Sequence, residues 1–394
     1  VLPAVIEAHY TQTPLIVITA DRPRNLRGTG APQAIEQKDL FANYVEKSLD
    51  IEVPWEGSLA TWSSRAPLHI NVCFDEPLLD GDIEPVTESL SPYATPAFPL
   101  MKWRGQSLEN VSLRDLCDEF QKFTSACRSP LLIVSDLEGQ SLGGVSSFIK
   151  NWSGLVYFEG LSGWRETSHP GKLQSGEHFL RKLLRDKKID SIVRLGGVPT
   201  TRLWRDIEKT KTPCFSLSMR PFSGLSKGQF YWLDNQLLSE LLPCLPKLES
   251  SHFNEILKED KKIQETWAGL LEKYPLSEPS WMRWVSGQIS EDANVYVGNS
   301  SPIRQWDLFA QPQGQQKVLA SRGANGIDGQ ISTAIGIASS CSSEVYCLVG
   351  DLTMLYDIGA LLIGLPTNLN IICIDNNGGR IFERVHTHNK MITA

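Results

Sequence analysis

Two short apolar runs near the carboxyl end constrain the fold of this chain most. Residues 345–349 (VYCLV) and 370–375 (NIICID) have the length and β-branched content of buried strands, and the apolar stretch 353–365 between them predicts a helix. A strand, a helix and a second strand in this order form a βαβ unit with parallel strands. The carboxyl ends of both strands then meet at one edge of the sheet, where α/β proteins bind their ligands.

Each of these strands is followed by a polar loop. Asp351 comes just after the first strand, and residues 376–379 (NNGG) follow the second. Mg²⁺ prefers hard oxygen ligands, which Asp351 offers as a carboxylate, Asn376 as an amide and Gly378 as a backbone carbonyl. The helix expected from Thr353 would direct its free N–H groups and its hydroxyl at a diphosphate in the same place. Either loop alone is more typical of an ordinary turn, but together they predict a magnesium–diphosphate clamp.

Strand and helix patterns also alternate in the rest of the chain. In the middle, apolar runs at 130–135, 154–158 and 190–195 are typical of a parallel sheet that is covered on both faces. Before the middle segment, the runs 14–20 (PLIVITA) and 68–74 (LHINVCF) predict two strands, and a polar stretch that contains four prolines follows them. We therefore expect these parts: residues 1–80, a linker at 81–100, residues 101–280 and residues 281–394.

The composition narrows the class of protein. The chain of 394 residues has a net charge of −7 and no basic stripe, which argues against binding to nucleic acid or to a membrane surface. No apolar run reaches the ~20 residues that a membrane-spanning helix needs. The eight cysteines show no CxxC pair and no zinc-binding spacing, which favours a reducing cytoplasm over secretion.

A glycine-rich segment precedes the clamp. Residues 322–329 (RGANGIDG) lead into 332–336 (STAIG). Together with the Gly-Asp pair and the later Asn-Asn pair, this segment resembles the signature of thiamine-diphosphate-dependent enzymes. In that family a bulky apolar residue on the glycine-rich loop supports the cofactor in a bent shape, and Ile327 matches that position.

Five strings carry a closer resemblance. They are residues 19–23 (TADRP), 30–35 (GAPQAI), 321–324 (SRGA), 350–352 (GDL) and 376–382 (NNGGRIF). In this order they resemble the MenD family, the 2-succinyl-5-enolpyruvyl-6-hydroxy-3-cyclohexene-1-carboxylate synthases. Leu352 is part of the match, because most thiamine-diphosphate-dependent enzymes have Gly after the clamp Asp.

The resemblance implies an α/β fold of three domains, each a mostly parallel sheet flanked by helices. Residues 1–80 would be the later part of a pyrimidine-binding domain, 101–280 a central Rossmann-like domain, and 281–394 an incomplete domain for diphosphate and Mg²⁺. The first and third domains would thus be truncated. In the family the cofactor lies between the first domain of one subunit and the third domain of another, which implies a homodimer or homotetramer.

The resemblance also implies an activity. With thiamine diphosphate and Mg²⁺ (or Mn²⁺), the family decarboxylates 2-oxoglutarate and adds the succinyl carbanion to isochorismate in menaquinone biosynthesis. Both substrates are dianions, so the site is expected to supply cations, preferably Arg, which forms paired hydrogen bonds with a carboxylate.

Site residues follow from the matched strings. The cofactor-binding residues would be Asp351, Leu352, Thr353, Asn376, Gly378, Ile327, Ser300, Ile381 and Phe382, and the metal ligands Asp351, Asn376 and Gly378. The substrate-binding residues would be Gln33, Arg304, Arg322, Arg202, Asn299 and Arg22. For Arg22 and Arg202 a role at the solvated surface fits the sequence equally well.

The sequence departs from the family in three respects. Pro32 stands where some relatives have Asn, and the spacing within the clamp is slightly shorter than in some relatives. The Glu that activates the family's cofactor would lie before Val1, and no Glu here takes its place; Glu7 lies in a different string. The alternatives are another thiamine-diphosphate-dependent carboligase or decarboxylase, which Leu352 and the TADRP string disfavour, and a non-catalytic diphosphate-binding protein, which the missing Glu keeps open.

Overall fold

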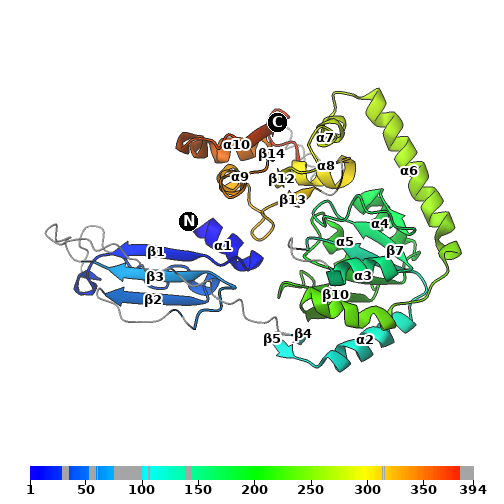
Figure 1. Cartoon of the computed structure of the whole chain (residues 1–394), viewed down its shortest axis with the longest axis horizontal. Helices are drawn as coiled ribbons and strands as arrows, with labels where there is room; N and C mark the ends of the chain where they lie inside the picture. Colours follow the sequence, from blue (N-terminus) through cyan, green and yellow to red (C-terminus); the bar gives the residue numbers. More distant parts are fainter. Residues whose placement is uncertain are drawn as a thin grey trace. The chain divides into compact units, whose positions relative to one another are not determined.

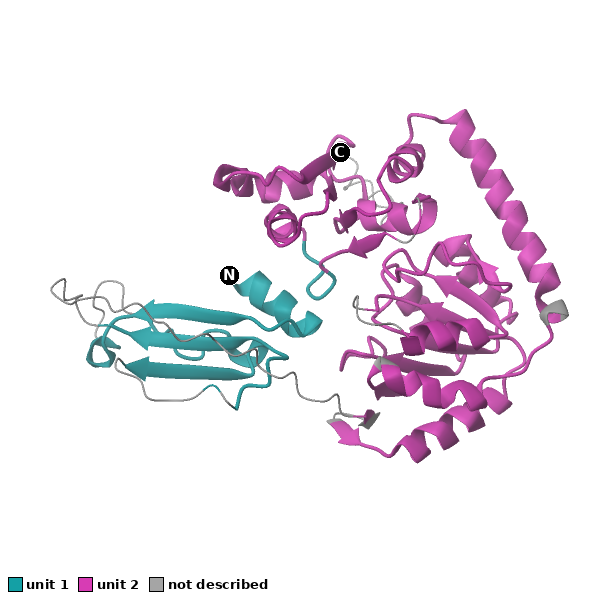
Figure 2. Cartoon of the chain, in the orientation of Figure 1, with its two compact units in different colours: residues 1–97, 322–326 teal, residues 98–321, 327–394 magenta. Residues whose placement is uncertain are grey.

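The fold was determined as a computed structural model (Figure 1). It describes residues 1–28, 35–52, 59, 61–74, 100–104, 107–137, 143–312, 314 and 316–381. Gln33, Phe382 and all but the last residue of the expected linker lie outside the described residues. The chain divides into two compact units, residues 1–97 with 322–326, and residues 98–321 with 327–394 (Figure 2).

The first unit contains a parallel sheet of three strands in the order β1-β3-β2. Its elements are α1 (Leu2–Thr11), β1 (Ile16–Asp21), η1 (Arg24–Leu26), η2 (Ala42–Tyr44), β2 (Lys47–Glu52) and β3 (Leu68–Cys73). The central strand β3 is buried along its whole length, because strands pair with it on both sides. Strands β1 and β3 match the predicted strands at this end of the chain, whereas the sequence reading did not identify β2.

The second unit contains an eight-stranded sheet in the order β5-β4-β11-β10-β9-β6-β7-β8. Its strands are β4 (Met101–Arg104), β5 (Ser107–Asn110), β6 (Pro130–Val134), β7 (Leu155–Phe158), β8 (Lys172–Leu173), β9 (Ser191–Leu195), β10 (Cys214–Ser218) and β11 (Gln229–Trp232). The helices around it are α2 (Leu113–Ser125), α3 (Gly143–Asn151), α4 (Gly176–Arg185), α5 (Leu203–Lys209), η3 (Asn235–Cys244) and η4 (Ser250–Phe253). All neighbouring strands are parallel except β4, which is antiparallel to both of its neighbours.

The alternation of side chains along β6 shows that this sheet is covered on both faces. Leu132 and Val134 pack into one hydrophobic cluster, and Leu131 and Ile133 pack into another. Because successive residues of a strand point to opposite faces, the two clusters lie on the two sides of the sheet. The predicted parallel sheet with two covered faces is therefore confirmed.

The second unit also contains a parallel four-stranded sheet in the order β13-β12-β14-β15. Its strands are β12 (Asn294–Val297), β13 (Lys317–Leu319), β14 (Val345–Gly350) and β15 (Leu369–Ile374). The accompanying helices are α7 (Glu278–Ser286), α8 (Ser301–Phe309), α9 (Gln330–Ser339), α10 (Asp351–Tyr356) and η5 (Ile358–Ile363). Helix α6 (Asn254–Lys273) leads to them from the eight-stranded sheet, where its Ile256 packs in the same cluster as Leu131 and Ile133. The predicted βαβ unit is thus present, with β14 and β15 as direct neighbours.

The prediction of a single helix over residues 353–365 is wrong. The segment forms the six-residue helix α10 and then the 3-10 helix η5, with a break at Asp357. The Asp357 carboxylate accepts hydrogen bonds from the backbone N–H of Ser332 at 2.7 Å and from its hydroxyl at 3.1 Å. Asp357 therefore caps the first turn of α9 instead of continuing its own helix, and the short α10 provides a weaker dipole than the prediction assumed.

Helix α8 is anchored to the eight-stranded sheet through Asp307. The Asp307 carboxylate accepts hydrogen bonds from the Tyr157 hydroxyl at 2.6 Å and from the Gly160 backbone N–H at 2.8 Å. Burial and the adjacent Asp307 carboxylate raise the pKa of Tyr157, so that its hydroxyl stays protonated and donates. This bond fixes the helix that begins at the carboxyl end of β12. Within the described residues no helix combines the length and apolar character that crossing a bilayer requires.

Candidate active site

The two loops of the predicted clamp are in direct contact. Gly350 lies opposite Ile374 in the register of β14 and β15, so both strands end at the same level. The Asp351 carboxylate accepts one hydrogen bond from its neighbour Leu352 N at 2.8 Å and another from Gly378 N at 2.7 Å. The parallel pairing of the strands therefore brings together loops that are far apart in the sequence.

The loop after β15 has an unusual backbone conformation. Asn377, Gly378 and Gly379 have φ angles of 63°, 97° and 67°. Glycine adopts positive φ without steric cost, and Asn is among the side chains that tolerate it best. The Asp375 carboxylate also accepts a hydrogen bond from Asn377 N at 2.9 Å, which closes the turn locally. Three successive left-handed residues thus explain why the sequence here is Asn-Gly-Gly.

Asn376 is oriented by a residue that the sequence reading missed. Its Nδ2 donates to Oε1 of Glu278 at 3.1 Å, and the other carboxylate oxygen of Glu278 accepts a hydrogen bond from Nε2 of Gln305. The Oδ1 atom of Asn376 has the Arg380 backbone N–H as a partner at 3.5 Å. Glu278 is the first residue of α7 and lies 98 residues before Asn376, and an acidic residue at a helix start is ordinary. No local signal could have identified its role.

The carboxyl end of β12 adds three more predicted residues to the same edge of the sheet. Asn299 is buried, and it donates from its backbone N–H to Gln330 Oε1 at 3.0 Å and from Nδ2 to the Ser321 carbonyl at 2.8 Å. Ser300 has a φ of 71°, and its carbonyl accepts a hydrogen bond from Nη1 of Arg304 on α8. Since β12, β14 and β15 are successive strands of one sheet, these residues and the Asp351 loop occupy one edge.

The end of β12 leaves little space for a side chain. A Cβ atom added to Gly298 would lie 2.9 Å from Gln330 Oε1 and 3.0 Å from the Leu348 carbonyl oxygen. The Gln330 side chain can shift, but the Leu348 carbonyl is part of the backbone of β14, so glycine fits this approach best. Gly298 therefore lets the β12 loop pass close to the strand that carries Asp351.

Four further residues that the resemblance assigns to the cofactor lie within the described residues. Leu352 and Thr353 follow Asp351 in the first turn of α10, where Leu352 is half-buried and Thr353 is buried, and the half-buried Ile381 follows the second clamp loop. Ile327 is half-buried and precedes α9 in the second unit. Their contacts with a cofactor stay predictions.

Of the other predicted arginines, Arg22 and Arg202 lie on different elements, whereas Arg322 directly follows Ser321, whose carbonyl accepts the hydrogen bond from Asn299. Arg22 is exposed after β1, and its backbone N–H donates to Asp21 Oδ1 at 2.8 Å. Arg202 precedes α5 beside the eight-stranded sheet, where its backbone N–H donates to Glu177 Oε2 at 2.8 Å. Arg322 is half-buried and begins the 322–326 segment of the first unit. Their roles in substrate binding therefore stay predictions.

The 322–326 segment is held by Glu7 of α1. The two oxygens of the Glu7 carboxylate accept hydrogen bonds from Gly323 N at 2.9 Å and Ala324 N at 2.7 Å. A Cβ atom on Gly323 would lie 2.8 Å from the Glu7 carbonyl oxygen, so glycine is needed for this close contact. Glu7 thus anchors a loop, and the expectation that it does not replace the family's activating Glu stays a prediction.

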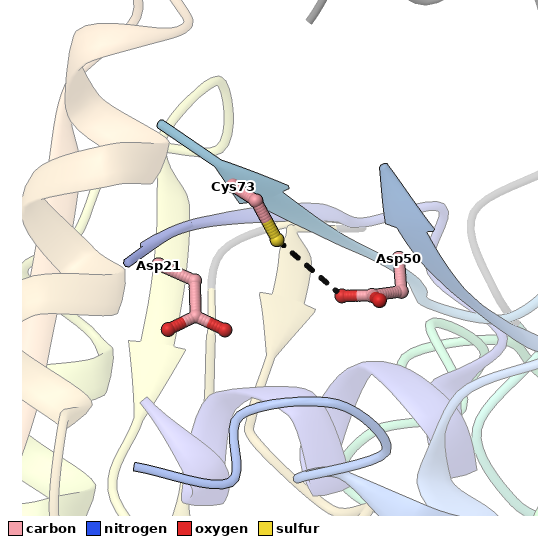
Figure 3. Close-up of side chains that lie close together, drawn as sticks. All are labelled: Asp21, Asp50 and Cys73. Atoms are coloured by element: carbon pink, nitrogen blue, oxygen red, sulfur yellow. Dashed lines mark hydrogen bonds between the residues drawn. The ribbon is translucent and has the colours of Figure 1, made fainter. Parts of the chain in front are cut away.

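A second polar cluster lies at the carboxyl end of the first sheet. The side chains of Asp21, Asp50 and Cys73 point toward one another, with Cys73 Sγ 3.9 Å from Asp50 Oδ1 (Figure 3). Carboxylates and a thiol are potential metal ligands. However, Nη2 of Arg27 donates to all three side chains, at 2.9 Å to Asp21, 2.6 Å to Asp50 and 3.0 Å to Cys73. The guanidinium takes the place that a cation would need.

The pKa shifts in this cluster agree with an ion-pair network. The hydrogen bond from Arg27 holds the pKa of Asp50 well below its usual range, and the Asn71 amide contributes to the same shift. Burial raises the pKa of the Cys73 thiol, so it remains protonated. The cluster therefore fixes the segment that follows β1 and provides no metal site.

The donor set of the clamp, by contrast, fits a hydrated Mg²⁺ ion with a diphosphate. Asp351, Asn376 and Gly378 offer a carboxylate, an amide oxygen and a carbonyl, all of them hard oxygen ligands. Glu278 turns the nitrogen of the Asn376 amide toward itself and so directs the oxygen elsewhere. Each side chain also has a hydrogen bond that holds it in place, as metal ligands in proteins usually do.

Known proteins resemble this chain over nearly its whole length. It is 37% identical over 397 residues to the 2-succinyl-5-enolpyruvyl-6-hydroxy-3-cyclohexene-1-carboxylate synthase of Bdellovibrio bacteriovorus, covering 98% of this chain and 72% of that protein. It is 34% identical over 387 residues to the synthase of the same name from Akkermansia muciniphila, covering 96% of this chain and 69% of that protein. No protein-family model matches the chain.

Solved structures support the same fold. Benzoylformate decarboxylase from Polynucleobacter necessarius superposes with a TM-score of 0.69 at 16% identity, over 99% of this chain and 74% of that one. A putative thiamin diphosphate-dependent enzyme from Mycobacterium smegmatis gives a TM-score of 0.61 at 14% identity, over 95% of this chain and 74% of that one. With this fold and these relatives, the chain belongs to the family of 2-succinyl-5-enolpyruvyl-6-hydroxy-3-cyclohexene-1-carboxylate synthases, which are thiamine-diphosphate-dependent transferases.

Proposed function

We propose that this protein decarboxylates 2-oxoglutarate and transfers the succinyl unit to isochorismate, giving 2-succinyl-5-enolpyruvyl-6-hydroxy-3-cyclohexene-1-carboxylate for menaquinone biosynthesis. The observation that carries the proposal is the hydrogen bond between Asp351 and Gly378, which joins the ends of β14 and β15. The product is the one in the name of the relatives, two of which are 37% and 34% identical to this chain.

In this proposal Asp351, Asn376 and the Gly378 carbonyl hold Mg²⁺ (or Mn²⁺) and thereby the diphosphate of thiamine diphosphate. When bound, thiamine diphosphate supplies the electron sink for the decarboxylation. The protein contributes the binding and orientation of the cofactor. Ile327 is assigned to the bend of the cofactor, and Leu352, Ile381 and Phe382 are assigned to its apolar surroundings.

Substrate binding is assigned first to the end of β12. Arg304 presents a planar guanidinium with five N–H donors, a geometry that matches the carboxylates of both dianionic substrates. The Ser300 carbonyl accepts a hydrogen bond from this guanidinium, and two hydrogen bonds hold the neighbouring Asn299 at the clamp edge of the sheet. Arg322, Arg202, Arg22 and Gln33 are further candidates for contacts with the substrates.

A reconstitution assay tests the proposed reaction. Because this chain spans 72% of the Bdellovibrio relative, the assay uses the product of the complete reading frame. We expect isochorismate to disappear only when 2-oxoglutarate, thiamine diphosphate and Mg²⁺ are all present. Pyruvate or benzoylformate in place of 2-oxoglutarate is the matched control, and both should be inactive.

Other outcomes of this assay would contradict the proposal. Release of CO₂ from pyruvate or benzoylformate, with isochorismate unchanged, would assign the protein to another carboligase or decarboxylase. Absence of thiamine diphosphate binding by the complete protein would assign it to the non-catalytic alternative.

We further propose that the protein forms a homodimer or homotetramer. Helices α10 and η5 expose several large apolar side chains, including Tyr356 at 70% and Leu362 at 89% of their surface. Apolar side chains that gather on a surface mark contacts with other chains. We expect light scattering after gel filtration to give at least twice the mass of one chain, and Leu362→Glu to shift the protein toward smaller species. Glu272→Lys, an exposed change on α6, is the control; a single-chain mass for the unaltered protein would contradict the proposal.

A further inference from the structure

Glu278 connects the clamp to two helices of the second unit. Its Oε1 accepts a hydrogen bond from Nδ2 of Asn376 at 3.1 Å, and its Oε2 accepts one from Nε2 of Gln305, a buried side chain of α8. Glu278 itself is half-buried at the start of α7. One carboxylate therefore ties the loop after β15 to both α7 and α8.

The chemistry of this contact determines the orientation of the Asn376 amide. The two ends of an amide have similar size, but one donates hydrogen bonds and the other accepts them. A carboxylate only accepts, so Glu278 holds the nitrogen end and turns the oxygen end away from itself. The Arg380 backbone N–H also favours this orientation, but at 3.5 Å from Asn376 Oδ1 it is a weak partner. Rotation about the last side-chain bond of Asn has broad, roughly two-fold minima, so without Glu278 the reversed orientation would become much more accessible. The reversed amide would present N–H groups, which are not ligands for a divalent cation.

We propose that Glu278 is a positioning residue of the clamp, which selects the orientation of Asn376 that presents its oxygen to Mg²⁺. This inference rests on the proposed function of Asp351, Asn376 and Gly378 as the ligands. Glu278 acts through Asn376 and is not itself a ligand in this proposal. Residues that orient metal ligands typically change metal affinity by roughly 10- to 100-fold when they are replaced.

The test measures how much Mg²⁺ the complete protein needs to bind thiamine diphosphate. Thiamine diphosphate binding is followed by calorimetry at a series of MgCl₂ concentrations. We expect Glu278→Met, which has a similar length but no acceptor, to raise the Mg²⁺ concentration for half-maximal binding by roughly 10- to 100-fold. Glu272→Met on the exposed face of α6 is the control and should leave it unchanged.

The conservative variant Glu278→Gln separates orientation from charge. Its Oε1 can still accept from Asn376, and its Nε2 can donate to Gln305 once the Gln305 amide turns around. The Oε1 atom of Gln305 has no hydrogen-bond partner among the described residues, so this turn breaks no other contact. Both variants lose the charge at the start of α7. If Glu278→Gln needs no more Mg²⁺ than the unaltered protein while Glu278→Met needs more, the difference is due to the hydrogen bond and not to the charge.

An Asn376→Asp background provides a second, independent test. A carboxylate has oxygen at both ends, so its orientation no longer matters, and it would also repel Glu278. In this background we expect Glu278→Met to leave the Mg²⁺ requirement unchanged or to lower it. If Glu278→Met raised the Mg²⁺ requirement as much in this background as in the native one, the proposal would be overturned.

Two further results would also overturn the proposal. One is an unchanged Mg²⁺ requirement in Glu278→Met, and the other is an equal increase of the Mg²⁺ requirement in Glu278→Gln and Glu278→Met. The ligand assignment is tested separately. If Asp351→Ala also bound thiamine diphosphate with an unchanged Mg²⁺ requirement, the proposed clamp itself would be wrong, whereas a loss in Asp351→Ala with no loss in Glu278→Met would overturn only the role of Glu278.

Discussion

Replacing Asp351 by Ala is expected to abolish Mg²⁺-dependent binding of thiamine diphosphate to the complete protein. The change removes the carboxylate of the proposed ligand set, and it also removes the acceptor for the Leu352 and Gly378 backbone N–H groups. Ligand charge and loop geometry are therefore lost together. We expect the affinity measured by calorimetry with MgCl₂ to fall by at least about 100-fold, or about 2.7 kcal/mol.

A matched pair of variants controls this experiment. Asp351→Asn and Asp375→Asn make the same chemical change on neighbouring loops. In Asp375→Asn the amide still has an oxygen that can accept the hydrogen bond from the Asn377 backbone N–H. Asp375→Asn should bind nearly as well as the unaltered protein, whereas Asp351→Asn should lose most of its affinity. Unchanged binding in Asp351→Ala would show that the clamp does not hold the cofactor.

The second large effect concerns stability. Arg27→Ala is expected to lower the free energy of unfolding by about 3 to 5 kcal/mol, because it removes the cation that pairs with Asp21 and leaves Asp50 with the more exposed Arg24. The Asp21 side chain is fully buried, so water cannot replace the lost partner well. The measurement is the urea-unfolding midpoint of the complete protein.

Arg24→Ala is the matched control for this prediction. Arg24 also pairs with Asp50, at 3.0 Å, but 44% of its side chain is exposed. An exposed pair contributes at most about 1 kcal/mol, so Arg24→Ala should shift the unfolding midpoint much less. Equal shifts in the two variants would show that the buried network does not stabilise the first sheet.

The same network predicts a dependence on pH. Arg27 lowers the pKa of Asp50 in the folded state, so its stabilising effect is present above the pKa of the unfolded chain, about 3.9, and is lost as the pH falls further. The unaltered protein should therefore lose stability in this acid range. Arg27→Ala should lose less over the same range, because the largest cause of the depressed pKa of Asp50 has been removed; equal acid sensitivity would contradict this origin of the effect.

Local patterns were sufficient to predict the strands that carry the clamp. The apolar runs around Val345 and Ile371 form β14 and β15, and their parallel pairing places Asp351 against Gly378. The sequence reading missed β2, whose residues KSLDIE contain only two apolar side chains, Leu49 and Ile51. It also missed the antiparallel β4 and β5, which are four residues each and give little periodicity.

Contacts between distant residues explain the other errors. The expected helix breaks at Asp357 because this side chain binds Ser332 of α9, a partner that lies 25 residues away. The role of Glu278 depends on Asn376 in the same way. The pattern of residues indicates which side chains can bind Mg²⁺, but the groups that hold them in place are determined by the tertiary structure.

The bond between Glu7 and the 322–326 segment has a consequence for synthesis. Its two ends lie 316 residues apart, so helix α1 leaves the ribosome long before Gly323 has been made. At roughly 5 to 20 residues per second, this interval is roughly 15 to 60 s. During that time the Glu7 carboxylate must remain in water, and the first unit can form only its local sheet. Completion of this unit is therefore a late event of translation, although most of the unit consists of residues 1–97.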